Sequence, residues 1–135
     1  MKQGIAYIRD TGSDNILLHI DTFHMNIEEA DQAQAIRHAR DYIGYFHVGE
    51  NHRGSLGSGT IDFARVFDAL VDVGYSKYVS VEAFNSRSIS DSLKAICAIW
   101  RENWSDSDAF ARHSKSFLEM RYEEARNRAA SYAVV

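Results

Sequence analysis

Short runs rich in apolar residues alternate along the chain with longer segments whose apolar residues recur at helical spacing. The runs occupy residues 16–21, 45–48 and 77–82. Runs of this length are typical of parallel strands, which are buried on both faces. The pattern therefore predicts three buried strands with helices between and after them.

The helices are predicted from apolar stripes and from residues suited to helix ends. Residues 4–10 have the pattern of the last part of a helix, whereas residues 22–29 are predicted to be a loop. Asp31 is a suitable N-cap for the next helix, and Gly74 is placed to end a later one. Apolar stripes predict the remaining helices in residues 63–70, 90–104 and 106–130.

The order of these elements predicts an α/β fold in a single domain spanning residues 1–135. Strands that alternate with helices over short connections are the signature of parallel βαβ units. A chain of 135 residues is much shorter than the ~250 residues of a complete eight-stranded TIM barrel. Three parallel strands also leave two unpaired edges, so we expect a homo-oligomer or a fragment of a longer chain.

Composition excludes several classes of function. The net charge of −4, with acidic and basic residues interspersed, provides no basic stripe for nucleic acid. No apolar stretch is long enough to cross a membrane, and the N-terminus does not resemble a secretory signal, so a cytoplasmic location is expected. Cys97 is the only cysteine, which excludes an intrachain disulfide and a cysteine-based zinc cluster.

Polar residues stand at or near the carboxyl end of each predicted strand. They are Asp21, His47 and Glu82. In parallel α/β folds this end of the sheet is where sites assemble. Two carboxylates and one imidazole suit a divalent ion such as manganese, cobalt or magnesium, with zinc not excluded. Any one of the carboxylates taken alone is better explained as a helix cap or a surface ion pair.

Three stretches of sequence resemble the D-tagatose 3-epimerase and D-psicose 3-epimerase family. Residues 18–29 (LHIDTFHMNIEE) are similar to a hallmark segment of that family. Residues 46–53 (FHVGENHR) resemble its metal-histidine segment, and residues 81–84 (VEAF) resemble its terminal carboxylate segment. The three stretches occur in the family's order, and the resemblance covers nearly the whole chain.

The resemblance implies the C-terminal three βα units of a TIM (β/α)8 barrel, incomplete in this chain. It implies that Asp21, His47 and Glu82 bind a divalent metal, Mn2+ first, with Co2+ or Mg2+ as alternatives. His24 and Arg53 would hold the hydroxyl groups of a ketose sugar substrate. Glu82 would also be a catalytic base, moving the proton at carbon 3 through an enediolate. The family's second glutamate lies on an earlier strand that this sequence does not contain.

Alternatives to a ketose 3-epimerase stay open. Hydroxypyruvate isomerase and inosose dehydratase share the scaffold that the resemblance implies. A truncated, non-catalytic metal- or sugar-binding remnant is an alternative from another class, favoured by the absent glutamate. A DNA repair nuclease is disfavoured, because such sites need more metal ligands and a basic surface.

Other conspicuous residues have simpler interpretations. The glycine-rich residues 54–59 lack the Lys-Ser/Thr pair of a phosphate-binding loop and are predicted to be a flexible loop over the site. His52 is a weaker candidate for a sugar contact than its neighbour Arg53. Trp100 and Trp104 occur at helical spacing and are expected in the core.

Overall fold

Three parallel strands form the centre of the structure, a computed structural model that describes residues 1–132. They are β1 (Leu18–Asp21), β2 (Ile43–Val48) and β3 (Val79–Val81), adjacent in that order. The predicted α/β fold with three parallel strands is confirmed. Residues 133–135, the end of the predicted domain, lie outside the described part of the chain.

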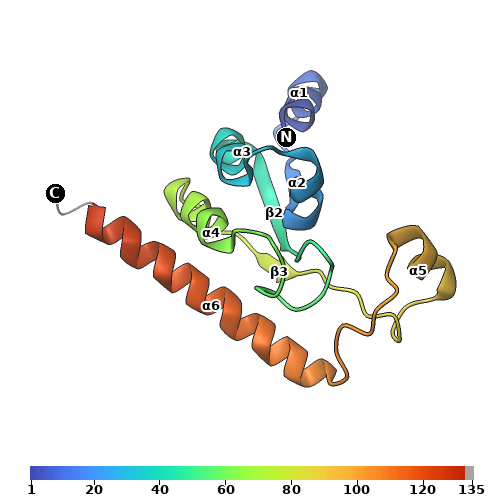
Figure 1. Cartoon of the computed structure of the whole chain (residues 1–135). Helices are drawn as coiled ribbons and strands as arrows, with labels where there is room; N and C mark the ends of the chain where they lie inside the picture. The colour runs from blue at the N-terminus through green and yellow to red at the C-terminus, as the bar shows by residue number, and fades with distance from the viewer. Residues whose placement is uncertain (133–135) are drawn as a thin grey trace.

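Helices occupy most of the remaining chain (Figure 1). They are α1 (Lys2–Thr11), α2 (Thr22–Glu28), α3 (Gln32–Ala39), the short 3-10 helix η1 (Arg40–Tyr42), α4 (Phe63–Asp72), α5 (Asp91–Cys97) and α6 (Ser107–Tyr132). Within residues 1–132, no helix combines the length and apolar character needed to span a bilayer.

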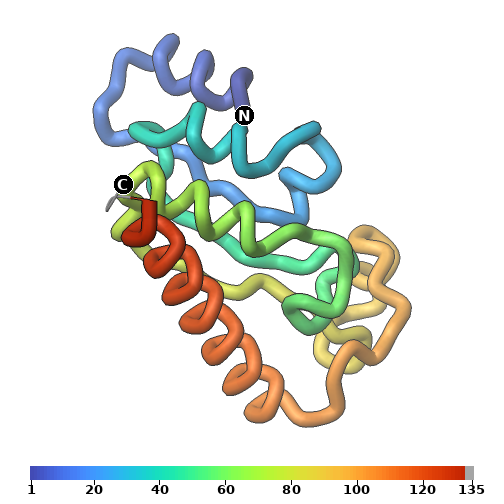
Figure 2. The backbone as a smooth tube through the Cα atoms, turned by 60° about the vertical axis from the view of Figure 1, so that its left-hand side comes forward, coloured from blue at the N-terminus to red at the C-terminus, as the bar shows by residue number. Residues whose placement is uncertain are grey.

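The core lies between one face of the sheet and a layer of helices. Helix α4 packs against both α3 and α6, and Figures 1 and 2 show α6 running alongside α4. Ile20, Phe46 and Val48 point toward this layer and are buried. Their neighbours on the other face, among them His19 and Tyr45, are exposed or half-buried. The predicted burial of both faces is therefore wrong for this three-stranded sheet, which does not close on itself.

Local signals in the sequence define the ends of the best-predicted helices. The Asp31 carboxylate accepts a hydrogen bond from the Gln34 N–H and caps α3, as predicted. After the C-terminal end of α4, Gly74 has φ 68°, and its N–H donates to the Val71 carbonyl. The Tyr75 N–H donates to the Leu70 carbonyl. This pair of bonds is a Schellman motif, whose left-handed position favours glycine.

Two of the predicted segments are wrong. Residues 22–28 form α2 instead of a loop, because the Asp21 carboxylate accepts from the Phe23 N–H and starts a helix directly after β1. The helix predicted over residues 90–104 ends at Cys97, since Ala98 adopts a left-handed conformation with φ 53°. Trp100 is consequently 70% exposed and lies outside the core.

Candidate metal centre

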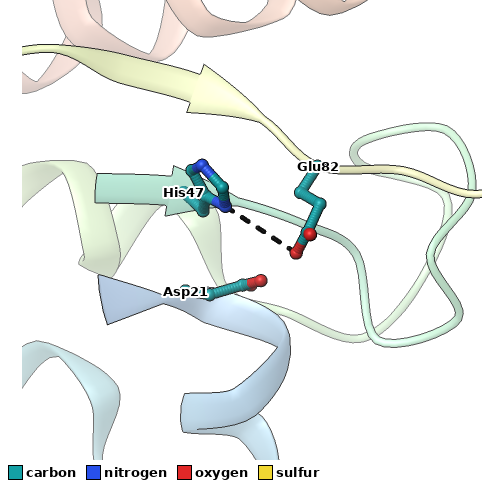
Figure 3. A group of neighbouring side chains, drawn as sticks. All are labelled: Asp21, His47 and Glu82. Atoms are coloured by element: carbon teal, nitrogen blue, oxygen red, sulfur yellow. Dashed lines mark ion pairs between the residues drawn. The ribbon is translucent and has the colours of Figure 1, made fainter. Parts of the chain in front are cut away.

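The carboxyl ends of the three strands bring together the three residues predicted to be metal ligands. Asp21 is the last residue of β1, and it pairs in register with His47 of β2. Glu82 directly follows β3, and its N–H donates to the Val48 carbonyl. Each residue offers one ligand atom, and these atoms all lie within 4.8 Å of one another (Figure 3). Their role as ligands stays a prediction, but the convergence that it requires is present.

Asp21 both caps a helix and forms an ion pair, the two roles that the sequence analysis offered as simpler explanations of a single carboxylate. Its Oδ1 accepts a hydrogen bond of 2.8 Å from the Phe23 N–H, so it caps α2, while its Oδ2 lies 2.7 Å from Arg53 Nη1. Burial of the carboxyl raises the pKa of Asp21. Hydrogen bonding to Glu82, to Arg53 and to the Phe23 N–H lowers this pKa, and the net shift is downward. The residue is therefore an anion at neutral pH, the form that binds a metal.

Arg53 bridges the two carboxylates of the group. Its Nη1 donates to Asp21 Oδ2 and to Glu82 Oε2, each at 2.7 Å. Its Nη2 lies 3.1 Å from His24 Nε2, and the guanidinium stands 3.8 Å above the centre of the Phe23 ring. Both residues predicted to bind sugar hydroxyls thus lie next to the predicted ligands. Four of the five predicted site residues are in direct hydrogen-bonded contact through Arg53.

The remaining member, His47, completes a donor set that fits a divalent ion. Its Nδ1 lies 3.7 Å from Glu82 Oε2, and its side chain is half-buried. His19 packs beside it, with the two ring centres 4.1 Å apart. Two carboxylate oxygens and one imidazole nitrogen are ligands that Mn2+, Co2+ and Mg2+ accept in proteins, and three protein ligands leave positions open for substrate. The residues present therefore suit such an ion.

Thr22 is a structural contributor that the sequence analysis missed. It is fully buried, and its hydroxyl donates to the Gly49 carbonyl at 2.6 Å and accepts from the Gly49 N–H at 2.9 Å. These bonds join the residue after Asp21 to the residue after β2. They fix the distance between the ends of β1 and β2, where Asp21 and His47 lie.

His52 lies against the glycine-rich residues 54–59. The Gly54 N–H donates to His52 Nδ1, and Ser58 Oγ lies 3.3 Å from His52 Nε2. His52 therefore holds its own loop. Glu50, which the sequence analysis did not include among the site residues, is buried beneath the same loop.

Comparison with known proteins identifies the family. Residues 1–114 match the family described as "Xylose isomerase-like TIM barrel". The chain belongs to this family. It is 56% identical to an L-ribulose 3-epimerase of Mesorhizobium japonicum over 94% of this chain and 43% of that protein. It is 38% identical to a ketose 3-epimerase of Arthrobacter globiformis, over 87% of this chain and 40% of the relative.

Solved structures of this family have the same arrangement of elements. A structure of L-ribulose 3-epimerase superposes with a TM-score of 0.93 at 53% identity, covering 97% of this chain and 44% of the other. A D-allulose 3-epimerase from Methylomonas sp., in complex with D-allulose, superposes with a TM-score of 0.83 at 40% identity, covering 88% of this chain and 41% of the other. The chain thus spans less than half the length of these relatives, and the predicted partial TIM barrel is confirmed.

Replacing Arg53 with methionine is expected to raise the affinity of the metal-free chain for Mn2+. The guanidinium contacts two of the three predicted ligands, so an arriving cation must displace it and meets its repulsion. We expect the affinity for Mn2+ to rise about tenfold. This change corresponds to a modest part of the Coulomb energy between close charges at a partly buried site. Isothermal titration calorimetry measures the change. The matched control is Arg65→Met, which breaks an exposed pair with Asp31; an unchanged or weaker affinity in Arg53→Met contradicts the competition.

Proposed function

We propose that the chain is the C-terminal part of a metal-dependent ketose 3-epimerase. The observation that carries the proposal is the meeting of Asp21, His47 and Glu82 at the ends of three successive strands, with Arg53 bridging two of them. The proposal is supported by similarity over most of this chain to relatives named L-ribulose 3-epimerase and ketose 3-epimerase. The metal-ligand set alone also suits the related isomerases on the same scaffold, and the similarity to 3-epimerases over most of the chain favours the ketose 3-epimerase.

Each side chain of the site has a distinct task in this proposal. Asp21, His47 and Glu82 hold the ion, with Mn2+ preferred and Co2+ or Mg2+ as alternatives. When bound, the ion supplies Lewis-acid stabilisation of the negative charge that develops on the substrate oxygens. Arg53 and His24 donate hydrogen bonds to hydroxyl groups of the ketose and orient carbon 3. The Glu82 carboxylate removes the proton from one face of that carbon.

Inversion at carbon 3 also requires a base on the opposite face, and the described residues supply none. Glu50 is fully buried under its loop, and Glu29 is the C-cap residue that ends α2. Glu28 is exposed on α2. A second carboxylate must therefore come from a neighbouring copy or from further strands of a longer chain, which would also cover the free edges of β1 and β3.

Hydrogen exchange at carbon 3 tests the proposal. The purified chain is incubated with D-psicose or D-tagatose in deuterated water, with Mn2+ or with a chelator, and the sugar is followed by NMR. Because Glu82 can remove and return the proton on one face, we expect deuterium at carbon 3 with little inverted product, and no exchange with the chelator.

The alternative function is a non-catalytic metal- or sugar-binding remnant, favoured by the lack of a second base among residues 1–132. A folded chain that binds Mn2+ and the ketose without exchanging the proton at carbon 3 supports the remnant and contradicts the epimerase. Exchange with full inversion means that the assembled protein contains the second base.

A further inference from the structure

Glu50 is a buried carboxylate that the proposed chemistry does not use. It has no exposed surface. Its Oε1 accepts from the N–H groups of Asn51 at 3.1 Å and Ile61 at 3.2 Å, and its Oε2 accepts from the Gly57 N–H at 3.0 Å. Among residues 1–132, no cationic side chain forms an ion pair with it. A buried charge without a counter-charge is costly, so these three backbone bonds account for its presence.

The three donors belong to both ends and the middle of one irregular loop, residues 50–61, which joins β2 to α4. One carboxylate therefore fixes the path of the whole loop. Gly59 approaches it so closely that an added Cβ would collide with Glu50 Oε1 and with the neighbouring Asn51 Oδ1. The loop is wrapped around the Glu50 side chain, and a larger residue at position 59 would push the two apart.

The same loop presents Arg53 to the metal centre. Arg53 has φ 60°, a left-handed conformation that is uncommon for a side chain of this size. Its N–H donates to the Glu50 carbonyl at 2.9 Å, and its carbonyl accepts from the Phe84 N–H at 2.9 Å. The uncommon backbone conformation persists because the surrounding loop enforces it. It directs the guanidinium of this buried residue, which is only 4% exposed as a whole, onto Asp21 and Glu82.

We propose that Glu50 is a positioning residue for Arg53, acting through the loop of residues 50–61. Its carboxylate holds the loop in the one path that places the Arg53 guanidinium between Asp21 and Glu82. For sugar binding the inference rests on the proposed function, because it assumes that Arg53 contacts the ketose. Glu50 does not itself touch the reacting atoms, since both of its oxygens are engaged by backbone N–H groups.

The first test uses the metal-free chain and is independent of any sugar. In 15N-edited NMR spectra of the wild type, we expect the Arg53 guanidinium N–H groups to give resolved signals that exchange slowly with water. In Glu50→Gln, an amide group faces the three donors. We expect the Arg53 guanidinium N–H groups and the Gly57 amide to exchange with water about tenfold faster or more. Arg53 signals that stay protected while the Gly57 amide is exposed overturn the proposal.

The second test is a double-mutant cycle on binding of D-psicose to the Mn2+-loaded chain. Glu50→Gln is expected to weaken binding of D-psicose about tenfold in the wild-type background, because the displaced Arg53 loses one charge-assisted hydrogen bond to the sugar. In the Arg53→Met background it is expected to have no further effect, because its target is gone. A purely structural role for Glu50 weakens binding equally in both backgrounds and overturns the proposal. If the wild type binds no ketose, the proposed function fails, and the NMR test still decides the role of Glu50.

Two further variants guard against misfolding of Glu50→Gln. Gly59→Ala disturbs the Glu50 carboxylate from the exposed side of the loop, together with the neighbouring Asn51 side chain, and we expect the same loss of Arg53 protection. Asp62→Asn is the matched control, because Asp62 also accepts a backbone N–H bond, from Arg65, but lies just outside the loop. We expect Asp62→Asn to leave the Arg53 signals unchanged. Gly59→Ala without effect on Arg53, in a folded chain, contradicts the proposal.

Discussion

Replacing Glu82 with glutamine is expected to reduce proton exchange at carbon 3 by about 10²–10⁴-fold, the usual contribution of a positioned general base. Glutamine has nearly the same shape but cannot accept the proton. Because Glu82 is also a predicted ligand, the variant is expected to bind Mn2+ more weakly. The exchange rate is therefore measured at saturating Mn2+, with occupancy followed by electron paramagnetic resonance.

The matched control for this prediction is Glu102→Gln. Glu102 also pairs with an arginine, with Arg87 Nε 3.0 Å from its Oε2, but this pair lies outside the metal centre. We expect full exchange in the control. An exchange rate in Glu82→Gln within a few-fold of the wild-type rate, at equal Mn2+ occupancy, means that another group removes the proton.

Replacing Asp21 with asparagine is expected to weaken Mn2+ binding about a hundredfold. Mutating a residue that only hydrogen-bonds to a metal ligand costs up to about this much, so losing a ligand is expected to cost no less. The change removes one of the two anionic ligands and also releases Arg53 from its partner. Asparagine is as good an N-cap as aspartate, so α2 is expected to persist. Isothermal titration calorimetry gives the affinity, and circular dichroism checks the helix content.

Asp31→Asn provides the control for the role of Asp21 as a cap. Asp31 caps α3 through the Gln34 N–H and pairs with Arg65, just as Asp21 caps α2 and pairs with Arg53. The predicted ligand role distinguishes the two aspartates, and so does burial, since Asp21 is buried and Asp31 is half-buried. Equal losses of Mn2+ affinity in both variants contradict a metal site at Asp21.

The convergence of Asp21, His47 and Glu82 was predictable because it depends on topology. Parallel strands in sequential order bring their carboxyl ends to one edge, whatever the length of the helices between them. The short apolar runs located these ends within a few residues. The caps at Asp31 and Gly74 were predictable for the same reason, since a local hydrogen-bond pattern determines each one.

The supporting contacts were not predictable from sequence patterns. A buried carboxylate satisfied by backbone N–H groups, as at Glu50, leaves no periodic signal, and neither does the left-handed backbone of Arg53. The seven-residue α2 is too short to show a helical stripe and was taken for a loop. The prediction that Trp100 lies in the core failed for another reason. Apolar spacing indicates a helix face that can be buried, but not whether this part of the chain provides a surface to cover it.

Anomalous diffraction at the manganese absorption edge, from crystals of the chain grown with Mn2+, shows directly whether Asp21, His47 and Glu82 form a metal site. We expect one strong peak within about 2.5 Å of side-chain atoms of Asp21, His47 and Glu82 together, with the Arg53 guanidinium moved away from at least one carboxylate. A manganese ion bound elsewhere, or a chain that holds none at this edge of the sheet while Arg53 stays in place, would contradict it.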